Sequence, residues 1–422
     1  MSSPHSHSHA HDPDAPPPTA EALGRRRRAV WLMLLLLVPV GLATVIGLLV
    51  LWPGGEPTRA EQAAEQALPP GTTYPDGRVA SLEPVDCGTP DLPATCGDAV
   101  VEVLGGEGDG DFVQIQLDPV VMANGVEQGD VLVLTRDAGA EGGAAYAFYD
   151  FARDTPIVVL ALAFALVVGL VARLRGLAAL LGLAFAFFVL LRFVLPGLLG
   201  EGSPVLVTLV GSAAIMFVVL YLAHGFSART TTALVGTLFG LTLVAVMGSL
   251  AVATARLTGV TSEETVTLQG YDPTLDFSGL VLAGIVVAGL GVLNDVTITQ
   301  ASAIWQLHEV DPSMSWRELY RRGMAVGRDH IASTVYTIVF AYAGAALPLL
   351  LLIEVYAQPI WTTITSVALA EEVIRTFVGA IALVLAVPVT TAAGAFFAKA
   401  ADAQGGTGTE RRLTALRARF SG

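Results

Sequence analysis

The chain has 422 residues, of which 53% are hydrophobic and 14% charged, with a formal net charge of −14 and a mean hydropathy of +0.64. This composition is too apolar and too poor in charge for an ordinary soluble domain, so it indicates a membrane protein. The negative net charge does not by itself predict a basic partner, because the charges are sorted by position along the chain.

Residues 1–28 are predicted to form a disordered, basic cytoplasmic leader, because they contain several prolines and no apolar periodicity. Neutral imidazoles are common metal ligands, so a histidine-rich run in this leader is a candidate site for a divalent metal. A flexible tract binds metal weakly and without selectivity, and the alternative is a leader with no metal function. The histidines of the run are His5, His7, His9 and His11.

Apolar runs of about 20 residues, which is the length needed to cross a bilayer, follow the leader. The first run gives residues 29–52 the character of an uncleaved transmembrane signal anchor, since it is longer than a signal peptide core and lacks a clear cleavage site. The remaining runs predict a transmembrane domain of about seven helices over residues 154–399. The apolar runs are 30–51, 156–174, 177–194, 204–223, 231–254, 277–297, 331–353 and 373–398.

The distribution of arginine and lysine predicts the orientation. A cytoplasmic N-terminus places most of the 23 basic residues on the inner side, as the positive-inside rule requires. Both termini then face the cytoplasm, residues 400–422 form a basic cytoplasmic tail, and residues 53–153 lie outside. We therefore expect a plasma-membrane protein.

Residues 53–153 differ from the rest of the chain, with short β-branched runs separated by glycine, aspartate and proline. The runs predict strands at 78–82, 99–104, 112–117, 131–135 and 145–148. Several short strands in so few residues favour a small β-barrel or sandwich, with the OB-like type as one of the options. The predicted fold class is thus an all-α membrane bundle of about eight transmembrane helices with an inserted extracytoplasmic β domain.

The chain has only two cysteines, Cys87 and Cys96, and both fall in this outer region. An isolated pair in an oxidising compartment predicts a disulfide, whereas two thiols alone make a poor zinc site.

A group of polar residues interrupts the end of the apolar run 277–297 and the segment after it. The group comprises Asn294, Asp295, Thr297, Thr299, Gln300 and Ser302. On a helix, a continuous stripe of small and polar residues results from the spacing of Gly284, Ala288, Gly291, Asp295, Thr299 and Ser302. Such a stripe is either a packing seam between helices or a functional site.

Asp295 lies roughly 27 Å along a helix that begins at residue 277, and so near the cytoplasmic boundary of the membrane. The same boundary is predicted to hold His224, Arg229, Arg328, Asp329 and His330. One interpretation makes Asp295 a titratable or cation-binding carboxylate with His224 as a proton relay. The alternative makes Asp295 an ion-pair partner of Arg229 or Arg328, and Asp329 a helix cap.

Two further segments carry local signals. Ser315 and Glu318 match the S-x-x-E capping pattern, which predicts that a helix begins there. Residues 358–370 have helical apolar spacing but are too short to span, so they either lie in the membrane interface or re-enter the bilayer.

The motifs that the sequence lacks narrow the function. It has no phosphate-binding P-loop, no H-E-x-x-H, no G-x-S-x-G and no heme-attachment motif. We therefore expect that the chain is not an enzyme, does not drive transport with ATP by itself, and uses no cofactor or nucleic-acid partner.

Residues 291–305 (GVLNDVTITQASAIW), together with the segments 325–329, 341–344 and His224-Gly225, resemble the YibE/F-like family of bacterial multi-pass membrane proteins. The resemblance covers residues 113–398. It implies a multi-helix protein of the bacterial plasma membrane that is described as permease-like. It also singles out, without assigning roles, Asn294, Asp295, Thr297, Thr299, Gln300, Arg328 and Asp329.

Two functional hypotheses follow. The polar group at the inner face and the absence of nucleotide motifs favour a secondary transporter or permease of unknown substrate. The alternative is a scaffold or sensor of the cell envelope that does not transport, whose outer β domain recruits a partner protein. In both cases the lipid bilayer is the first partner.

Overall fold

The computed structural model describes residues 20–401 except 68, 70, 90–93, 140–143 and 357–358, and the chain divides into two compact units. The β unit comprises residues 55–177 with 268–273, and the helical unit comprises the described residues before 55, 178–267 and those from 274 onwards. The four leader histidines and nearly all of the basic tail lie outside the described residues.

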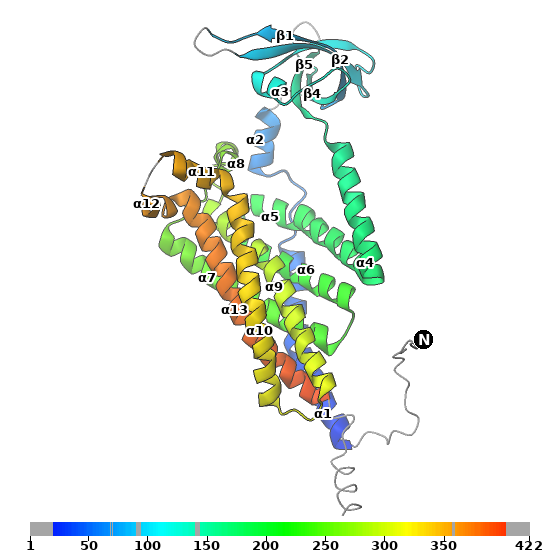
Figure 1. The fold of residues 1–422 in the computed structure, drawn as a ribbon, viewed down its shortest axis with the longest axis vertical. Coiled ribbons are helices and arrows are strands. Elements are labelled where there is room, and N and C mark those ends of the chain that lie inside the picture. The colour runs from blue at the N-terminus through cyan, green and yellow to red at the C-terminus, as the bar shows by residue number, and fades with distance from the viewer. Residues whose placement is uncertain are drawn as a thin grey trace, which may run out of the picture. The chain divides into compact units, whose positions relative to one another are not determined.

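The β unit contains a five-stranded antiparallel sheet with the strand order β3-β2-β1-β4-β5 (Figure 1). A short helix, α3 (Pro119–Ala123), connects β3 to β4, and α2 (Arg59–Ala67) precedes the sheet. Each predicted strand is confirmed, and most extend beyond the predicted ends. The strands are β1 (Asp76–Asp86), β2 (Thr95–Leu104), β3 (Phe112–Leu117), β4 (Val131–Asp137) and β5 (Ala145–Phe151).

Alternating side chains on these strands form the core of the β unit. Ala99, Val101 and Val103 on β2 are fully buried, and they pack with Leu117 and Leu132 from neighbouring strands. The central strand β1 pairs with β2 along its length and with β4 through its first residues, and its register with β2 shifts between Val79 and Ser81. Bulges of this kind bend a strand and increase its twist, which suits the small curled sheet.

The predicted disulfide between Cys87 and Cys96 is confirmed, with the two Cα atoms 5.7 Å apart. It closes the connection between β1 and β2 where the register pairs Asp86 with Thr95. The bond therefore fixes the end of this hairpin.

The long apolar helices belong mainly to the helical unit. Within the described residues, six stretches are long and apolar enough to cross a membrane, namely Trp31–Val50, Asp154–Leu199, Pro204–His224, Ala228–Ala255, Phe277–Val310 and Val367–Ala400. The corresponding elements are α1 (Ala20–Val50), α4 (Asp154–Val189) with η1 (Leu190–Val194) and α5 (Leu195–Leu199), α6 (Pro204–His224), α7 (Ala228–Ala255), α9 (Phe277–Val310) and α13 (Val367–Ala401). The remaining helices are α8 (Glu263–Tyr271), α10 (Trp316–Ala345), α11 (Leu347–Tyr356) and α12 (Ile360–Ile364).

Two differences from the predicted spans concern helix breaks. The Asp154–Leu199 stretch has 46 residues, but its backbone leaves the helical region at Arg173 (φ 56°, ψ −135°), between the predicted spans 156–174 and 177–194. The predicted span 331–353 is not among the six stretches, because α10 begins with a charged half and ends at Ala345, before α11. The segment 358–370 is also divided, with α12 ending at Ile364 and α13 beginning at Val367. The number of membrane crossings stays a prediction.

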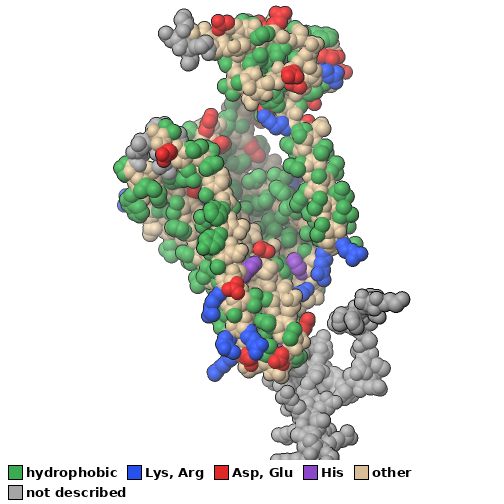
Figure 2. Space-filling view, viewed as in Figure 1, with side chains coloured by type: hydrophobic (Ala, Val, Ile, Leu, Met, Phe, Trp, Pro, Cys, Tyr) green, Lys and Arg blue, Asp and Glu red, His purple; other side chains and the backbone are tan. Residues whose placement is uncertain are grey.

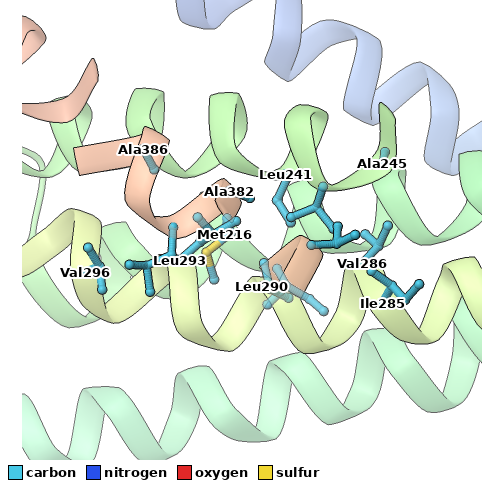
Figure 3. Packing of buried hydrophobic residues seen from close by; sticks show 14 of the residues in the cluster. Met216, Leu241, Ala245, Ile285, Val286, Leu290, Leu293, Val296, Ala382 and Ala386 are labelled. Carbon is cyan, nitrogen blue, oxygen red and sulfur yellow. The ribbon is translucent and has the colours of Figure 1, made fainter. Parts of the chain in front are cut away.

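The core of the helical unit is built around α9, which packs against α6, α7, α10 and α13. Figure 3 shows Ile285, Leu290 and Leu293 of α9 facing buried side chains that include Leu241 of α7 and Ala382 of α13. Small residues on the partner helices allow this close approach, which is how membrane helices pack without a hydrophobic driving force between them.

Candidate functional site in the polar residues of α9

Helix α9 continues beyond the apolar run 277–297 to Val310, so it includes Thr299 and Ser302, as the predicted polar stripe requires. The polar residues lie inside the helix because their hydroxyl groups bond to its own backbone. Thr299 Oγ1 donates to the carbonyl oxygen of Asp295 at 2.7 Å, and Ser302 Oγ donates to that of Ile298 at 2.7 Å. A loss of hydropathy therefore did not mark a loss of helix.

The candidate residues divide between two faces of α9. Thr297 and Gln300 are 0% and 2% exposed, and their side chains point into the bundle. Asp295 and Thr299 are exposed, and Asn294 is half-buried. The candidate set is thus one buried group and one open group rather than a single site.

Gln300 is the centre of the buried group. Its Nε2 atom donates to the carbonyl oxygen of Gly323 on α10 at 2.9 Å and to Thr391 Oγ1 on α13 at 2.7 Å. On the α7 side, the hydroxyl oxygens of Thr237 and Thr297 lie 2.6 Å apart. These contacts form a buried polar seam that links α7, α9, α10 and α13, and such hydrogen bonds hold helices together in a membrane.

Glycines on α10 make room for Gln300. A Cβ atom at Gly327 would lie 3.1 Å from Gln300 Oε1, and one at Gly323 would overlap Ile304. These partners of Gln300 were not predicted from the sequence, although the Gly323-x-x-x-Gly327 spacing is a known signal for close helix packing. Thr237 and Thr391 gave no comparable signal, since their partners lie far away in the sequence.

The open group joins α9 to α10. Thr299 Oγ1 lies 3.2 Å from Nε2 of His330, so a hydroxyl and an imidazole meet one helical turn from the Asp295 carboxylate. Within the open group, Asn294 Oδ1 is buried and has no hydrogen-bond partner in the described part of the chain. The exposed carboxylate of Asp295 and the Thr299–His330 pair thus share this face of the helix, and a carboxylate and an imidazole are groups that can exchange protons.

The alternative interpretation of Asp295 as an ion-pair partner is not supported by the contacts of the described residues. None of their ion pairs joins Asp295 to Arg229 or Arg328. Arg229 lies half-buried in the first turn of α7, and Arg328 is exposed in the middle of α10.

Two other predicted roles change with the helix boundaries. The interpretation of Asp329 as a helix cap is wrong, because α10 runs through it from Trp316 to Ala345. The cap of α10 is Ser315, whose Oγ accepts a hydrogen bond from the backbone N–H of Glu318 at 3.2 Å, as the capping pattern predicts. His224 is the last residue of α6 and is exposed, and its carbonyl oxygen accepts a hydrogen bond from Thr230 Oγ1 at 3.5 Å.

Charged side chains on the displayed face of the helical unit gather near the connection between α9 and α10. Figure 2 shows basic side chains interspersed with acidic ones at this end, an acidic side chain and histidines close together above it, and a mostly hydrophobic surface beyond. An apolar surface of this kind suits contact with lipid, and the basic side chains suit contact with anionic headgroups.

The long apolar helices, the buried polar seam and the separate β sheet define a helical membrane protein that carries a small β unit. The sequence model of the YibE/F-like proteins matches residues 160–400, and the chain belongs to this family, as the resemblance predicted. No curated protein and no solved structure matches the chain.

Proposed function

We propose that the chain is a secondary permease of the plasma membrane, in which Asp295 binds the transported or coupled cation at the inner face. The observation that supports this role is that Asp295 is exposed on an apolar helix and forms no ion pair within the described residues. Thr299, which contacts His330, lies one helical turn further along. A carboxylate within a membrane span is costly and is typically retained for function. The proposal assigns neither a substrate nor an enzymatic activity, and it needs no cofactor.

The proposed orientation places both termini in the cytoplasm and the β unit outside. The disulfide supports an oxidising compartment for residues 87–96, and the basic end of the helical unit supports a cytoplasmic location for the connection between α9 and α10. The break at Arg173 and the apolar second half of α10 support about eight crossings. The strand order and the helix between β3 and β4 support an OB-like sheet.

The test is ion flux in proteoliposomes that contain the purified full chain. Under an imposed proton, sodium or potassium gradient, the wild-type protein is expected to carry a flux that a pH-sensitive or ion-sensitive dye reports. Asp295→Asn keeps the size of the side chain and removes the charge, so the flux is expected to fall about tenfold or more.

Glu309→Gln is the matched control, because Glu309 is an exposed carboxylate on the same helix, roughly 21 Å further along. This variant is expected to keep the wild-type flux. Undiminished flux in Asp295→Asn would contradict the role of Asp295, and wild-type protein without flux under all three gradients would contradict the permease.

A second candidate function is a scaffold or sensor, and one observation in the β unit favours it. A cavity of about 470 Å³ is lined by Asp76, Asn124, Asp130, Phe151 and Asp154, among others, so its lining combines acidic groups with one aromatic side chain. A partner with a basic side chain would suit this cavity. A photoreactive amino acid placed at Asn124 tests the function in cells, and failure to crosslink any envelope protein would count against the scaffold.

A further inference from the structure

A buried carboxyl group lies near the start of α13. Glu371 is only 7% exposed, and its Oε2 atom accepts a hydrogen bond from Thr261 Oγ1 at 3.0 Å. Its Oε1 atom is also buried, but it has no hydrogen-bond partner among the described residues. An ionised carboxylate here would leave a charged oxygen unsatisfied in apolar surroundings, which is costly.

The nearest cation on the same helix forms no ion pair with Glu371 within the described residues. Arg375, one turn further along α13, donates its Nη1 to Glu372 Oε1 at 2.6 Å. Its Nη2 lies beside α9, where a Cβ atom at Gly284 would be 3.6 Å away. Of the ion pairs in the described part of the chain, none includes Glu371. With both carboxyl groups ionised, negative charge would exceed positive charge in this group.

The other titratable groups at this end of the bundle do not satisfy Oε1. Tyr342 on α10 interacts electrostatically with Arg375 and Glu372. Asp276 caps α9 by accepting hydrogen bonds from Gly279 N and Ser278 Oγ, and Arg256 at the end of α7 is exposed. The dipole of α13 favours a charged carboxylate only within its first turn, and Glu371 lies in the second.

A proton suits this geometry better than a metal ion does. Metal cations need several oxygen ligands, whereas the described residues contain no group of three or more His, Cys, Asp or Glu side chains that could hold a metal ion. A proton needs one oxygen, and Oε1 is the one that lacks a partner.

We propose that Glu371 is a proton-binding site of the helical unit, with the proton on Oε1 in the packed conformation. The proton leaves to water when the segment that carries Thr261 separates from α13 and the carboxyl group becomes hydrated. Only the O–H bond on Oε1 forms and breaks, and water supplies and accepts the proton. A role for Glu371 in coupling rests on the proposed permease function, whereas proton binding itself does not.

Infrared difference spectroscopy on the full chain in lipid nanodiscs tests the proposal. At neutral pH, the wild-type protein is expected to show the carbonyl stretch of a protonated carboxylic acid, which 13C-labelling of glutamate shifts. Glu371→Gln is expected to abolish this band, and the exposed-carboxylate control Glu309→Gln is expected to keep it. A wild-type protein without the band, or a band that persists in Glu371→Gln, would overturn the proposal.

A second variant keeps the test decisive if Glu371→Gln does not fold. Thr261→Val leaves the carboxyl group of Glu371 in place and removes the hydroxyl that donates to its Oε2 atom. The carbonyl band is therefore expected to move to higher frequency. An unchanged frequency would overturn the assignment of the band to Glu371. Because the band is measured without transport, its absence is distinguishable from a failure of the flux experiment on Asp295.

Discussion

Thr237 on α7 and Thr297 on α9 are both fully buried, with their hydroxyl oxygens 2.6 Å apart. Each hydroxyl also lies within hydrogen-bond distance of a carbonyl oxygen of its own helix, Thr237 of that of Ala233 at 3.0 Å and Thr297 of that of Asn294 at 3.3 Å. One hydroxyl can therefore donate across the interface while the other stays satisfied within its helix. The pair ties α7 to α9 without leaving an unsatisfied donor.

A double-mutant cycle with Thr237→Val and Thr297→Val measures this contact. Hydrogen bonds between membrane helices average about 0.6 kcal/mol, so we expect a coupling free energy of roughly 0.5–1 kcal/mol from reversible unfolding in mixed micelles. Thr242→Val is the control for α7, because Thr242 is exposed and bonds only to the carbonyl oxygen of Leu238 at 2.9 Å. If the effects of the two buried substitutions on the free energy of unfolding were additive, the contact between Thr237 and Thr297 would contribute no coupling free energy.

Gln300→Leu is expected to be more costly than either threonine change. It removes both donations, to Gly323 and to Thr391, and leaves these acceptors buried without that donor, so we expect a loss of about 1–3 kcal/mol in the free energy of unfolding. Gln306→Leu is the matched control, because Gln306 is exposed on the same helix. If both variants unfolded at the same midpoint, Gln300 would have no special role in the seam.

The sequence predicted the elements of the fold better than it predicted the faces of α9. The strands and the disulfide followed from local signals, namely β-branched runs between turn residues and an isolated cysteine pair. Helix α9 continues past the apolar run 277–297, since threonine and serine hydroxyls bond to their own helix. It ends just before Asp311-Pro312, where proline disfavours continuation.

The division of the candidate site could not be predicted from one sequence. Helical spacing showed which residues share a face, but not which face another helix covers. Gln300 is buried because its partners Gly323 and Thr391 lie 23 and 91 residues away, and only the tertiary fold brings them together. Asp295 has no such partner and therefore stays on the open face.

Two glycines provide a direct test of which faces are packed. A Cβ atom at Gly236 on α7 would overlap Thr390 Oγ1, whereas one at Gly291 on α9 would meet nothing within 4 Å. Gly236→Ala is therefore expected to lower the free energy of unfolding by about 1–3 kcal/mol. Gly291→Ala is expected to be neutral or to stabilise the helix by up to about 1 kcal/mol. A clear decrease in the free energy of unfolding of Gly291→Ala would show that the open face of α9 is covered in the protein tested.

Cysteine crosslinking tests the contact between α9 and α10. The natural cysteines are joined to each other, so Thr299→Cys with His330→Cys introduces the only free thiols. Because the native side chains approach to 3.2 Å, mild oxidation is expected to crosslink most of the protein, as mass spectrometry of the linked peptides would show. Thr299→Cys with Tyr336→Cys is the control, since Tyr336 is 67% exposed. Equal crosslinking of both pairs would contradict the described contact.

The disulfide offers a test of both the β unit and its location. Cys87 and Cys96 are nine residues apart. Removing the disulfide that closes this short loop is expected to lower the stability of the β unit by about 2–3 kcal/mol. The double variant Cys87→Ser with Cys96→Ser should therefore unfold at a lower temperature, or be cut faster by protease in residues 87–96, than the wild type. Reductant should bring the wild type to the level of the variant and leave the variant unchanged.

In intact cells, an outer location predicts that a membrane-impermeant thiol reagent labels Cys87 and Cys96 only after reduction. Labelling without reduction would show that the bond does not form in the cell, and the absence of labelling even after reduction would contradict the outer location.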